Sequence, residues 1–147
     1  MNTDVVISTE RTQLDVEFVV SALQSTYWAA SRSRKDILSS IERSLCFGAF
    51  DSVSGRQVGF ARVVTDGVTF SWICDVFVDP ACRGKGIGKR LVSEVVAHPE
   101  VKMTNAYLGT KDAHSLYEKF NFKRWELMRR DKKAAQPSAT DNPGCAQ

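Results

Sequence analysis

A glycine-rich, basic turn lies within DVFVDPACRGKGIGKRL, residues 75–91, directly after an apolar stretch that is typical of a strand. In this turn glycines alternate with lysine and isoleucine: Gly84, Lys85, Gly86, Ile87, Gly88 and Lys89. Glycines let successive backbone N–H groups approach an anion closely, and a helix that begins beside them adds the positive end of its dipole. The turn therefore indicates a phosphate cradle, to which Arg90 adds charge. A flexible basic surface turn is the alternative for this turn taken alone.

The spacing excludes two well-known phosphate-binding loops. A Walker loop has four residues between its first glycine and Gly-Lys, and Ser or Thr follows. Here three residues separate Gly84 from Gly88, and Arg90 follows Lys89. A dinucleotide fingerprint needs a third glycine where Lys89 stands, and no suitable βαβ unit precedes it. What remains is the pattern Arg83-x-x-Gly86-x-Gly88 at a junction between a strand and a helix.

Asp75 is the only charged residue in the apolar run from Phe70 to Val78. A carboxyl group in such a place should have a raised pKa if it stays unpaired, which suits a general base. A structural salt bridge or a strand-end hydrogen bond is the alternative. Asp66, in the preceding turn, is a second candidate for the base, with an ordinary turn aspartate as its alternative.

Hydrophobic periodicity predicts helices and strands that position these residues. The expected strands are residues 5–8, 45–50, 57–64, 68–78, 104–110 and 122–128. The expected helices are residues 13–24, residues 35–44, one from the glycines to His98-Pro99, and residues 112–120 with Asp112 as the cap. DSVSGR and TDG are turn sequences typical of hairpins. An antiparallel meander followed by strand–helix–strand–helix–strand predicts an α/β (α+β) fold, with a mixed, mostly antiparallel sheet of six to seven strands flanked by about four helices.

Composition limits the class of protein. A length of 147 residues with 43% hydrophobic and 25% charged residues predicts one domain, residues 1–130, and a disordered tail, residues 131–147, without apolar periodicity. A net charge of +3 argues against a nucleic-acid partner, and no signal peptide or membrane-length apolar run is visible. The four cysteines have no metal-like spacing, so no metal is expected, and a reducing cytoplasm is the expected compartment.

Two motifs resemble the GCN5-related N-acetyltransferases (GNAT). VDPACRGKGIGKRL is similar to the family's acetyl-CoA motif, R-x-x-G-x-G/A after V-x-P, and AHSLYEKFNF, residues 113–122, is similar to A-x-x-L-Y-x-K-x-G-F. The motifs are independent and correctly ordered, and the resemblance covers roughly residues 3–128. It implies a GNAT-like fold, acetyl-CoA as co-substrate and direct transfer in a ternary complex. Cys82, without a paired histidine, is not expected to carry the acetyl group.

The resemblance also implies roles for individual residues. The turn takes the diphosphate of acetyl-CoA on its amides, and Arg83 either contacts the co-substrate or braces the loop. The pantetheine arm pairs like an extra strand with residues of the strand that enters the turn, where it splays from residues 104–110: Val76, Phe77 and Val78. Thr110 stands where the family often has Asn. Tyr117 corresponds to the residue that protonates the leaving thiolate, with a core-packed tyrosine as the alternative.

The acceptor is expected to contact the connection between the first two helices, where Tyr27, Trp28, Arg32 and Arg34 cluster. Aromatic rings beside arginines suit a small primary amine that bears an apolar part or a carboxylate. The same residues could instead pack the connection onto the core. A protein or peptide amine acetyltransferase and a non-catalytic acyl-CoA-binding module are the other function classes. Partners on the membrane are not expected, and the protein is expected as a monomer or a homodimer.

Overall fold

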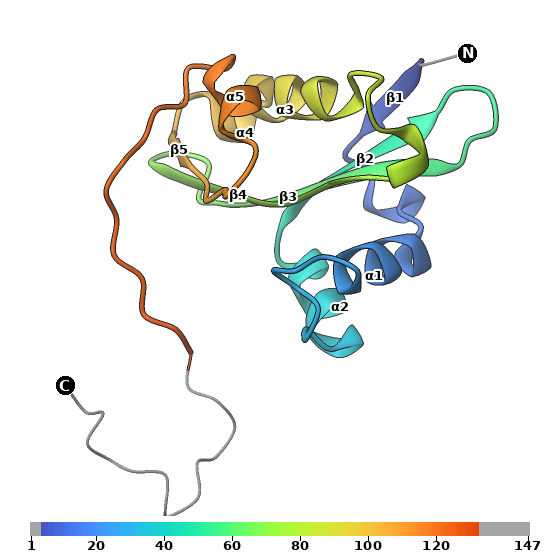
Figure 1. Cartoon of the computed structure of the whole chain (residues 1–147), viewed down its shortest axis with the longest axis horizontal. Coiled ribbons are helices and arrows are strands. Elements are labelled where there is room, and N and C mark those ends of the chain that lie inside the picture. Colours follow the sequence, from blue (N-terminus) through green and yellow to red (C-terminus); the bar gives the residue numbers. More distant parts are fainter. Residues whose placement is uncertain (1–3, 133–147) are drawn as a thin grey trace, which may run out of the picture.

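The computed structural model describes residues 4–132 as one central sheet with helices on both faces (Figure 1). The strands lie in chain order, β1-β2-β3-β4-β5. Their bounds are Val5–Ser8, Leu45–Asp51, Gln57–Thr65, Phe70–Val78 and Asn105–Tyr107. The first four strands are antiparallel and β5 pairs parallel to β4. The mixed, mostly antiparallel sheet and its hairpins confirm the predicted class.

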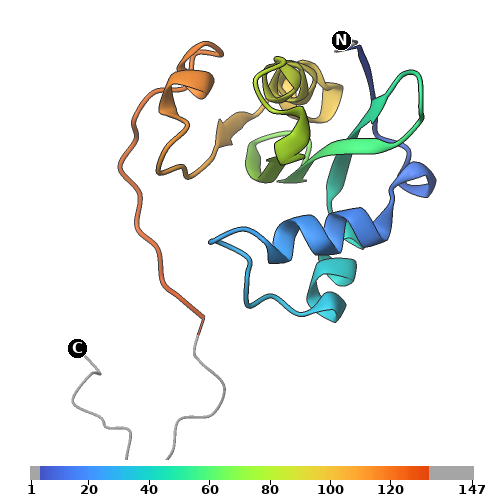
Figure 2. The same cartoon turned by 45° about the vertical axis from the view of Figure 1, so that its right-hand side comes forward.

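Five α-helices cover the sheet in the described part of the chain. They are α1 (Val16–Gln24), α2 (Arg34–Glu42), α3 (Ile87–Ala97), α4 (Pro99–Lys102) and α5 (His114–Glu118). Helices α1 and α2 lie on one face, whereas α3, α4 and α5 lie on the other (Figures 1 and 2). Short 3₁₀ helices occupy Arg11–Gln13 and Pro80–Cys82. None of the helices within residues 4–132 has the length and apolar character needed to span a bilayer.

The sheet separates two hydrophobic cores. Leu91 and Val95 of α3 pack on one face with Phe47 and Ile73. The second core packs Val19, Leu23, Ile37 and Ile41 of α1 and α2 against the opposite face, around Phe60. The helical spacing of these apolar residues gives each helix one buried stripe, which is why both faces of the sheet are covered.

A β-bulge interrupts β4 in front of the glycine-rich turn. The register between β3 and β4 shifts between Phe60 and Arg62, and Asp75 has the left-handed φ of 54°. Because of the extra residue, the side-chain alternation changes phase at this point. Asp75 and Phe77 consequently face α1, as the edge-to-face contact of Phe77 with Phe18 shows at 6.1 Å.

The bulge also marks where β4 and β5 separate. The two strands pair only at Phe70–Trp72 and Asn105–Tyr107. Beyond that point the edge of β4 that would face β5 has no strand partner among residues 4–132. The predicted splay in front of the turn is therefore present.

The prediction of a strand at residues 122–128 is wrong, and the sheet has five strands rather than six to seven. From residue 123 on, this segment is extended and exposed, and no backbone of the described residues pairs with it. A strand needs a hydrogen-bonding neighbour, and sequence periodicity reports only the extended shape.

One smaller expectation also fails. Asp112 does not cap α5, and the hydroxyl of Thr110 accepts a hydrogen bond from Ala113 N at 3.0 Å. The expected end of the helix at His98-Pro99 is confirmed, because α3 ends at Ala97. The short helix α4 begins there, with His98 Nδ1 accepting from Glu100 N. The assignment of residues 1–130 to one domain stays a prediction. The predicted disorder of residues 131–147 falls largely on residues 133–147, which lie outside the described residues.

Candidate active site

The glycine-rich turn presents a row of free backbone N–H groups. Gly84 and Gly86 adopt φ of 81° and 80°, and Gly86 is the N-cap of α3. Within residues 4–132 the N–H groups of residues 84–89 have no acceptor. The helical hydrogen bonds of α3 begin with Arg90 N, which donates to Gly86 O. Six consecutive donors at a helix N-terminus form a site that suits a diphosphate.

The basic side chains around the turn divide into two groups. Lys85 and Lys89 make no hydrogen bond or salt bridge within the described chain, so their ammonium groups remain available to a ligand. Arg90 instead donates to Val5 O at 2.6 Å and lies 3.7 Å from Asp4. Its guanidinium therefore fixes α3 to β1, and the expected contact with the co-substrate would use the N–H donors that Nη1 leaves free.

Arg83 braces the turn against β4. Its Nε donates to Val78 O at 3.0 Å, and its guanidinium lies 5.6 Å from the centre of the Phe77 ring. This is one of the two roles that the sequence left open for Arg83. The brace fixes the end of β4 relative to the cradle.

Helix α5 lies beside the beginning of α3. A methyl group on Gly88 would come within 3.7 Å of Val78 and 4.0 Å of Leu116. The turn, the end of β4 and α5 are thus neighbours, although two helices and one strand separate α5 from the turn in the chain. The structure brings the two sequence motifs together.

Tyr117 is the buried residue of α5. Its ring contacts Phe122 edge-on at 5.9 Å, and its hydroxyl has no hydrogen-bond partner within the described residues. Burial, with a smaller effect of the Asp112 charge, raises the pKa of Tyr117 to about 12. The phenol therefore stays protonated at neutral pH and has a proton to donate.

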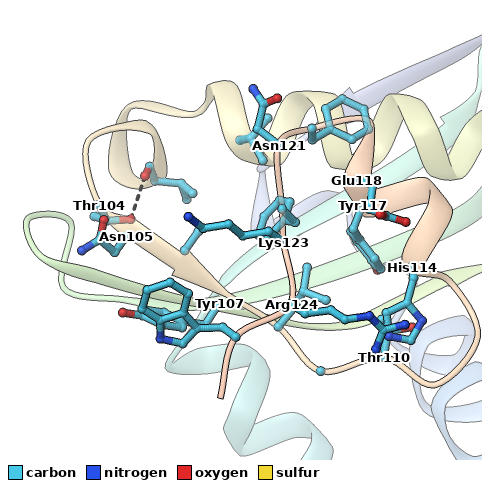
Figure 3. A pocket seen from close by; sticks show the side chains of 18 of the residues that line it. Thr104, Asn105, Tyr107, Thr110, His114, Tyr117, Glu118, Asn121, Lys123 and Arg124 are labelled. Atoms are coloured by element: carbon cyan, nitrogen blue, oxygen red, sulfur yellow. Dashed lines mark hydrogen bonds between the residues drawn. The ribbon is translucent and has the colours of Figure 1, made fainter. Parts of the chain in front are cut away.

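Tyr117 lines an open groove of about 850 Å³ between β5, α5 and the residues that follow α5. Figure 3 shows Asn105 and Tyr107 on one side of this groove and Tyr117 and Glu118 on the other. Thr110 and His114 line the same end as Tyr117, but the glycine-rich turn is not part of the groove. The groove therefore extends away from the cradle, on the far side of β5.

Asp75 lies at the centre of a buried ionic cluster beneath the α1–α2 connection. Its Oδ2 accepts from Arg32 Nη1 at 2.7 Å and from Arg62 Nε at 2.9 Å, while Oδ1 accepts from Trp28 Nε1 at 3.1 Å. Burial alone would raise the pKa of Asp75, but the hydrogen bonds and charges of the two arginines outweigh it, so the pKa is lowered. The Asp75 carboxylate is therefore paired, whereas the raised pKa expected from the sequence required an unpaired carboxyl group.

Asp66 makes a compact turn. Its carboxylate accepts from the backbone N–H groups of Val68, Thr69 and Phe70 and from the Thr69 hydroxyl, which hold its pKa below the usual range. These bonds favour the alternative of an ordinary turn aspartate.

The α1–α2 connection, residues 25–33, contacts both β4 and the loop after β5. Tyr27 packs edge-on against Trp28 at 5.0 Å and carries Lys111 Nζ 4.8 Å from its ring centre. The connection is thereby joined to the loop after β5 as well as to Asp75. Arg34 is elsewhere, in an exposed pair with Glu17.

The sequence interpretation missed Arg62 and Lys111. Arg62 is the single charged residue within the strand QVGFARVV, a signal equal to the one that marked Asp75. Pairing these two isolated charges on adjacent strands would have predicted the cluster. Nothing in the local sequence distinguishes Lys111.

We expect Asp75→Asn to destabilise the fold, because two partly buried arginines lose their buried anion. Breaking such a pair costs about 3 kcal/mol, or roughly 6–12 °C in melting temperature for a domain of this size. Since the folded pKa is lowered, the stabilisation is present above the unfolded value of about 3.9 and is lost as the pH falls through the folded pKa. Thermal melts from neutral to acidic pH should show this acid dependence in the native protein only.

Glu17→Gln is the matched control, since it removes the anion of the exposed pair with Arg34 and should change the melting temperature little. Turnover per folded molecule should remain substantial in Asp75→Asn. Normal melting with lost turnover would contradict the structural role of Asp75 and favour the base.

Comparisons with known proteins agree with the geometry. Residues 42–124, which include the cradle and Tyr117, match the family model of the acetyltransferase (GNAT) domain. The chain belongs to the GNAT family. The resemblance seen in the two motifs is confirmed, and the protein is an acyltransferase of this family.

A solved GNAT structure covers nearly all of this chain. It is a candidate acetyltransferase from Xanthomonas campestris pv. campestris, 39% identical, with a TM-score of 0.82 over 88% of this chain and 94% of that chain. A candidate acetyltransferase of Gibberella zeae is 30% identical over 104 residues, 58% of this chain and 59% of its own. Serotonin N-acetyltransferase 2 of Oryza sativa subsp. japonica is 44% identical over 46 residues, 31% of this chain. The chain spans 59% and 23% of these two relatives.

GNAT domains use acetyl-CoA as co-substrate, and the features of this chain fit that molecule. The six free N–H groups and two free lysines match its diphosphate, and the unpaired edge of β4 at Val76–Val78 matches its amide-bearing arm. Residues 4–132 contain no cluster of three or more histidine, cysteine, aspartate or glutamate side chains arranged to hold a metal ion.

Proposed function

We propose that this protein transfers the acetyl group of acetyl-CoA to the primary amine of a small molecule that carries an apolar group and an anion. The observation that carries the transfer is the row of six free N–H groups at the start of α3, beside the helix that holds Tyr117. Acetyl-CoA supplies a thioester, whose C–S bond breaks as the amine nitrogen takes the acetyl group.

The chain's own residues bind, orient and supply a proton. The cradle at residues 84–89 binds the diphosphate, and the edge of β4 at Val76–Val78 orients the arm towards the splay from β5. The Thr110 hydroxyl, which accepts a hydrogen bond from Ala113 N, has its own proton free for an amide of that arm. Tyr117 donates its phenolic proton to the departing thiolate as the C–S bond breaks, and the phenolate left behind, which is the stronger base, takes a proton back from water.

Asp75 acts through other residues rather than as the base. Both of its oxygens accept hydrogen bonds and its pKa is lowered, so it is a poor proton acceptor. It is a positioning residue that holds Trp28 and Arg32 at the acceptor end of the site. The acceptor's own proton leaves to solvent water.

The charge around Asp75 favours an anionic acceptor. Two arginines bond one carboxylate, since Arg32 and Arg62 both donate to Asp75. Arg62 Nη1 also donates to the Ser44 hydroxyl, and Arg11 Nη2 donates to the Ser44 carbonyl. Arg32 uses one of its donors in these bonds and its side chain stays partly exposed. A carboxylate on the acceptor would balance this excess charge.

The exposed rings of Tyr27 and Trp28 favour an apolar group on the same acceptor. The rice relative is named for serotonin, in which an ethyl chain joins a primary amine to an aromatic ring, and this supports a small alkylamine that bears an aromatic group.

A panel of amines with thiol release as the signal tests this proposal. Phenylalanine and phenylethylamine differ only in a carboxylate, and we expect kcat/KM to be at least about 10-fold higher for phenylalanine, the effect of one charge-assisted hydrogen bond. Preference for phenylethylamine would overturn the anionic acceptor while leaving the transfer reaction intact. Release with a lysine-containing peptide alone would identify a protein acetyltransferase, and no release with any amine would contradict catalysis.

A further inference from the structure

Trp72 is the last residue of β4 that pairs with β5. It lies opposite Tyr107, and beyond this pair the two strands separate. On its other side Trp72 lies opposite Val64 of β3, two residues after Arg62, so the side chains of Trp72 and Arg62 project from the same face of the sheet. This face also holds Asp75 and the α1–α2 connection. Trp72 therefore stands at the closed end of the splay, on the acceptor side.

The Trp72 indole lacks the partners that occupy the other two tryptophans. Trp28 packs against Tyr27 and donates to Asp75, and Trp125 carries a lysine ammonium over its ring. Within residues 4–132 the Trp72 side chain makes no hydrogen bond and contacts neither another aromatic ring nor a cation. The side chain is also only partly buried. Its ring is therefore available to a ligand.

Gly109 leaves the edge of this ring open. A methyl group on Gly109 would lie 4.0 Å from Trp72 Cη2, which is an ordinary van der Waals distance, and it would meet no closer atom of the described residues. Gly109 is not among the glycines with a positive φ, so its backbone conformation accepts a larger residue. Neither backbone strain nor crowding accounts for glycine here. The absence of a side chain leaves space for a ligand beside Trp72.

The proposed arrangement of acetyl-CoA brings the reacting thioester towards this ring. The diphosphate lies on the turn that follows Val78, so an arm that pairs with Val76–Val78 runs back along β4 in the direction of Trp72. Val76 is four residues from Trp72, at most about 13 Å by the rise of a strand. An amine that attacks the thioester can therefore place its apolar group on Trp72 and its anion on Arg32, since both side chains lie on the acceptor side.

We propose that Trp72 determines the specificity for the acceptor by stacking on an aromatic ring of that molecule, and that Gly109 keeps the place of this ring open. The inference rests on the proposed function and narrows the apolar group of the acceptor to an aromatic ring. A planar ring lies flat on the indole, whereas a saturated ring of the same size gains only the buried area. The stacking beyond buried area corresponds to roughly 2- to 10-fold in affinity.

Paired acceptors test this proposal in a thiol-release assay with the full 147-residue chain. Phenylalanine and cyclohexylalanine carry the same amine and carboxylate, but only phenylalanine has a planar ring. We expect kcat/KM of the native enzyme to be roughly 2- to 10-fold higher for phenylalanine. In Trp72→Leu, which keeps an apolar side chain on β4, this ratio should fall to about one. Both acceptors are measured on one preparation, so a partial loss of folded enzyme cancels in the ratio.

Phe70→Leu is the matched control for Trp72→Leu. Phe70 lies two residues earlier on the same face of β4 and stacks on Tyr107, away from the splay. This variant should keep the native ratio. Phenylethylamine and cyclohexylethylamine repeat the comparison without the carboxylate, so the result for Trp72 does not depend on the anion of the acceptor.

Gly109→Val tests the space beside the ring. Valine puts two methyl groups at the edge of the Trp72 indole, so kcat/KM for phenylalanine should fall at least about 10-fold. The smaller acceptor alanine should change by less than about 2-fold, because its methyl group does not reach the ring. The calorimetric affinity for acetyl-CoA should stay near the native value, which separates loss of the acceptor from loss of the co-substrate.

A native enzyme that uses both rings equally well, or a Trp72→Leu variant that keeps the native ratio, would overturn the role of Trp72 and leave the transfer reaction intact. Equal losses for phenylalanine and alanine in Gly109→Val would overturn the role of Gly109. Absence of thiol release with every amine would contradict the proposed function itself, and this inference with it.

Discussion

Replacing Tyr117 by phenylalanine should lower turnover by roughly 10- to 1000-fold, the range expected when a general acid is lost. The substitution removes the phenolic oxygen and its proton but keeps the ring, so the contact with Phe122 survives. Because the hydroxyl has no partner within the described residues, its removal leaves no donor or acceptor unpaired. The affinity for acetyl-CoA and the melting temperature should therefore change little.

Tyr107→Phe is the matched control for this substitution. Tyr107 of β5 stacks on Phe70 of β4, and the Tyr107 hydroxyl makes no hydrogen bond within residues 4–132. We expect near-normal turnover from this variant in initial-rate measurements at saturating acetyl-CoA. Unchanged turnover in Tyr117→Phe would return Tyr117 to the alternative of a core-packed side chain.

The pH dependence of the native enzyme adds a second condition. With a pKa of about 12, Tyr117 keeps its proton up to pH values well above neutral. The rise in rate from neutral to mildly alkaline pH should therefore follow deprotonation of the acceptor amine and persist in Tyr117→Phe at a lower level.

The sequence predicted the elements that bury a periodic apolar face. The helix containing Val19 and Leu23 and the three strands around two short turns are where periodicity indicated them, because burial on the sheet decides their conformation. The sequence placed the start of α1 at residue 13, which is too early. The N-cap of α1 is Asp15, whose carboxylate accepts from Phe18 N. Local hydrogen bonds of this kind decide the ends of helices.

Residues 122–128 show where sequence periodicity is insufficient. Phe122, Trp125 and Leu127 give the segment a strand-like composition, and the segment is indeed extended. Whether an extended segment becomes a strand depends on a neighbouring backbone, which no residue of the segment itself encodes.

The candidate site also contains residues whose role was predictable from the sequence and residues whose role was not. The glycines at 84 and 86 were predictable because the left-handed backbone of the turn requires them. The state of Asp75 was not, because it depends on Arg32 and Arg62, which lie 43 and 13 residues away in the chain. The lone charge was recognised, but its role depends on contacts that only the fold establishes.

Binding of acetyl-CoA in the turn is the central claim, and Gly86→Glu is the variant that should abolish it. A side chain at Gly86 would project from the cradle into open space, where no atom of the described residues lies within 4 Å, so it would occupy the place of the diphosphate. Its carboxylate would also repel the phosphates and cancel the positive end of α3. We expect affinity to fall at least about 100-fold and turnover to fall with it.

Gly55→Glu separates this effect from backbone strain. Gly55 has φ of 76° against 80° for Gly86, and a side chain there also meets no atom within 4 Å, but it lies in the β2–β3 turn. Both variants should suffer a similar strain of about 1–2 kcal/mol from glutamate in a left-handed conformation. Their melting temperatures should therefore be similar, and only Gly86→Glu should lose the co-substrate.

Calorimetric titration of acetyl-CoA into the native protein, Gly86→Glu and Gly55→Glu is the most direct measurement. The predicted result is binding of one acetyl-CoA per chain to the native protein and to Gly55→Glu, with no measurable binding to folded Gly86→Glu. Equal affinity in all three proteins, or no binding to the native protein, would contradict the assignment of the turn as the acetyl-CoA site.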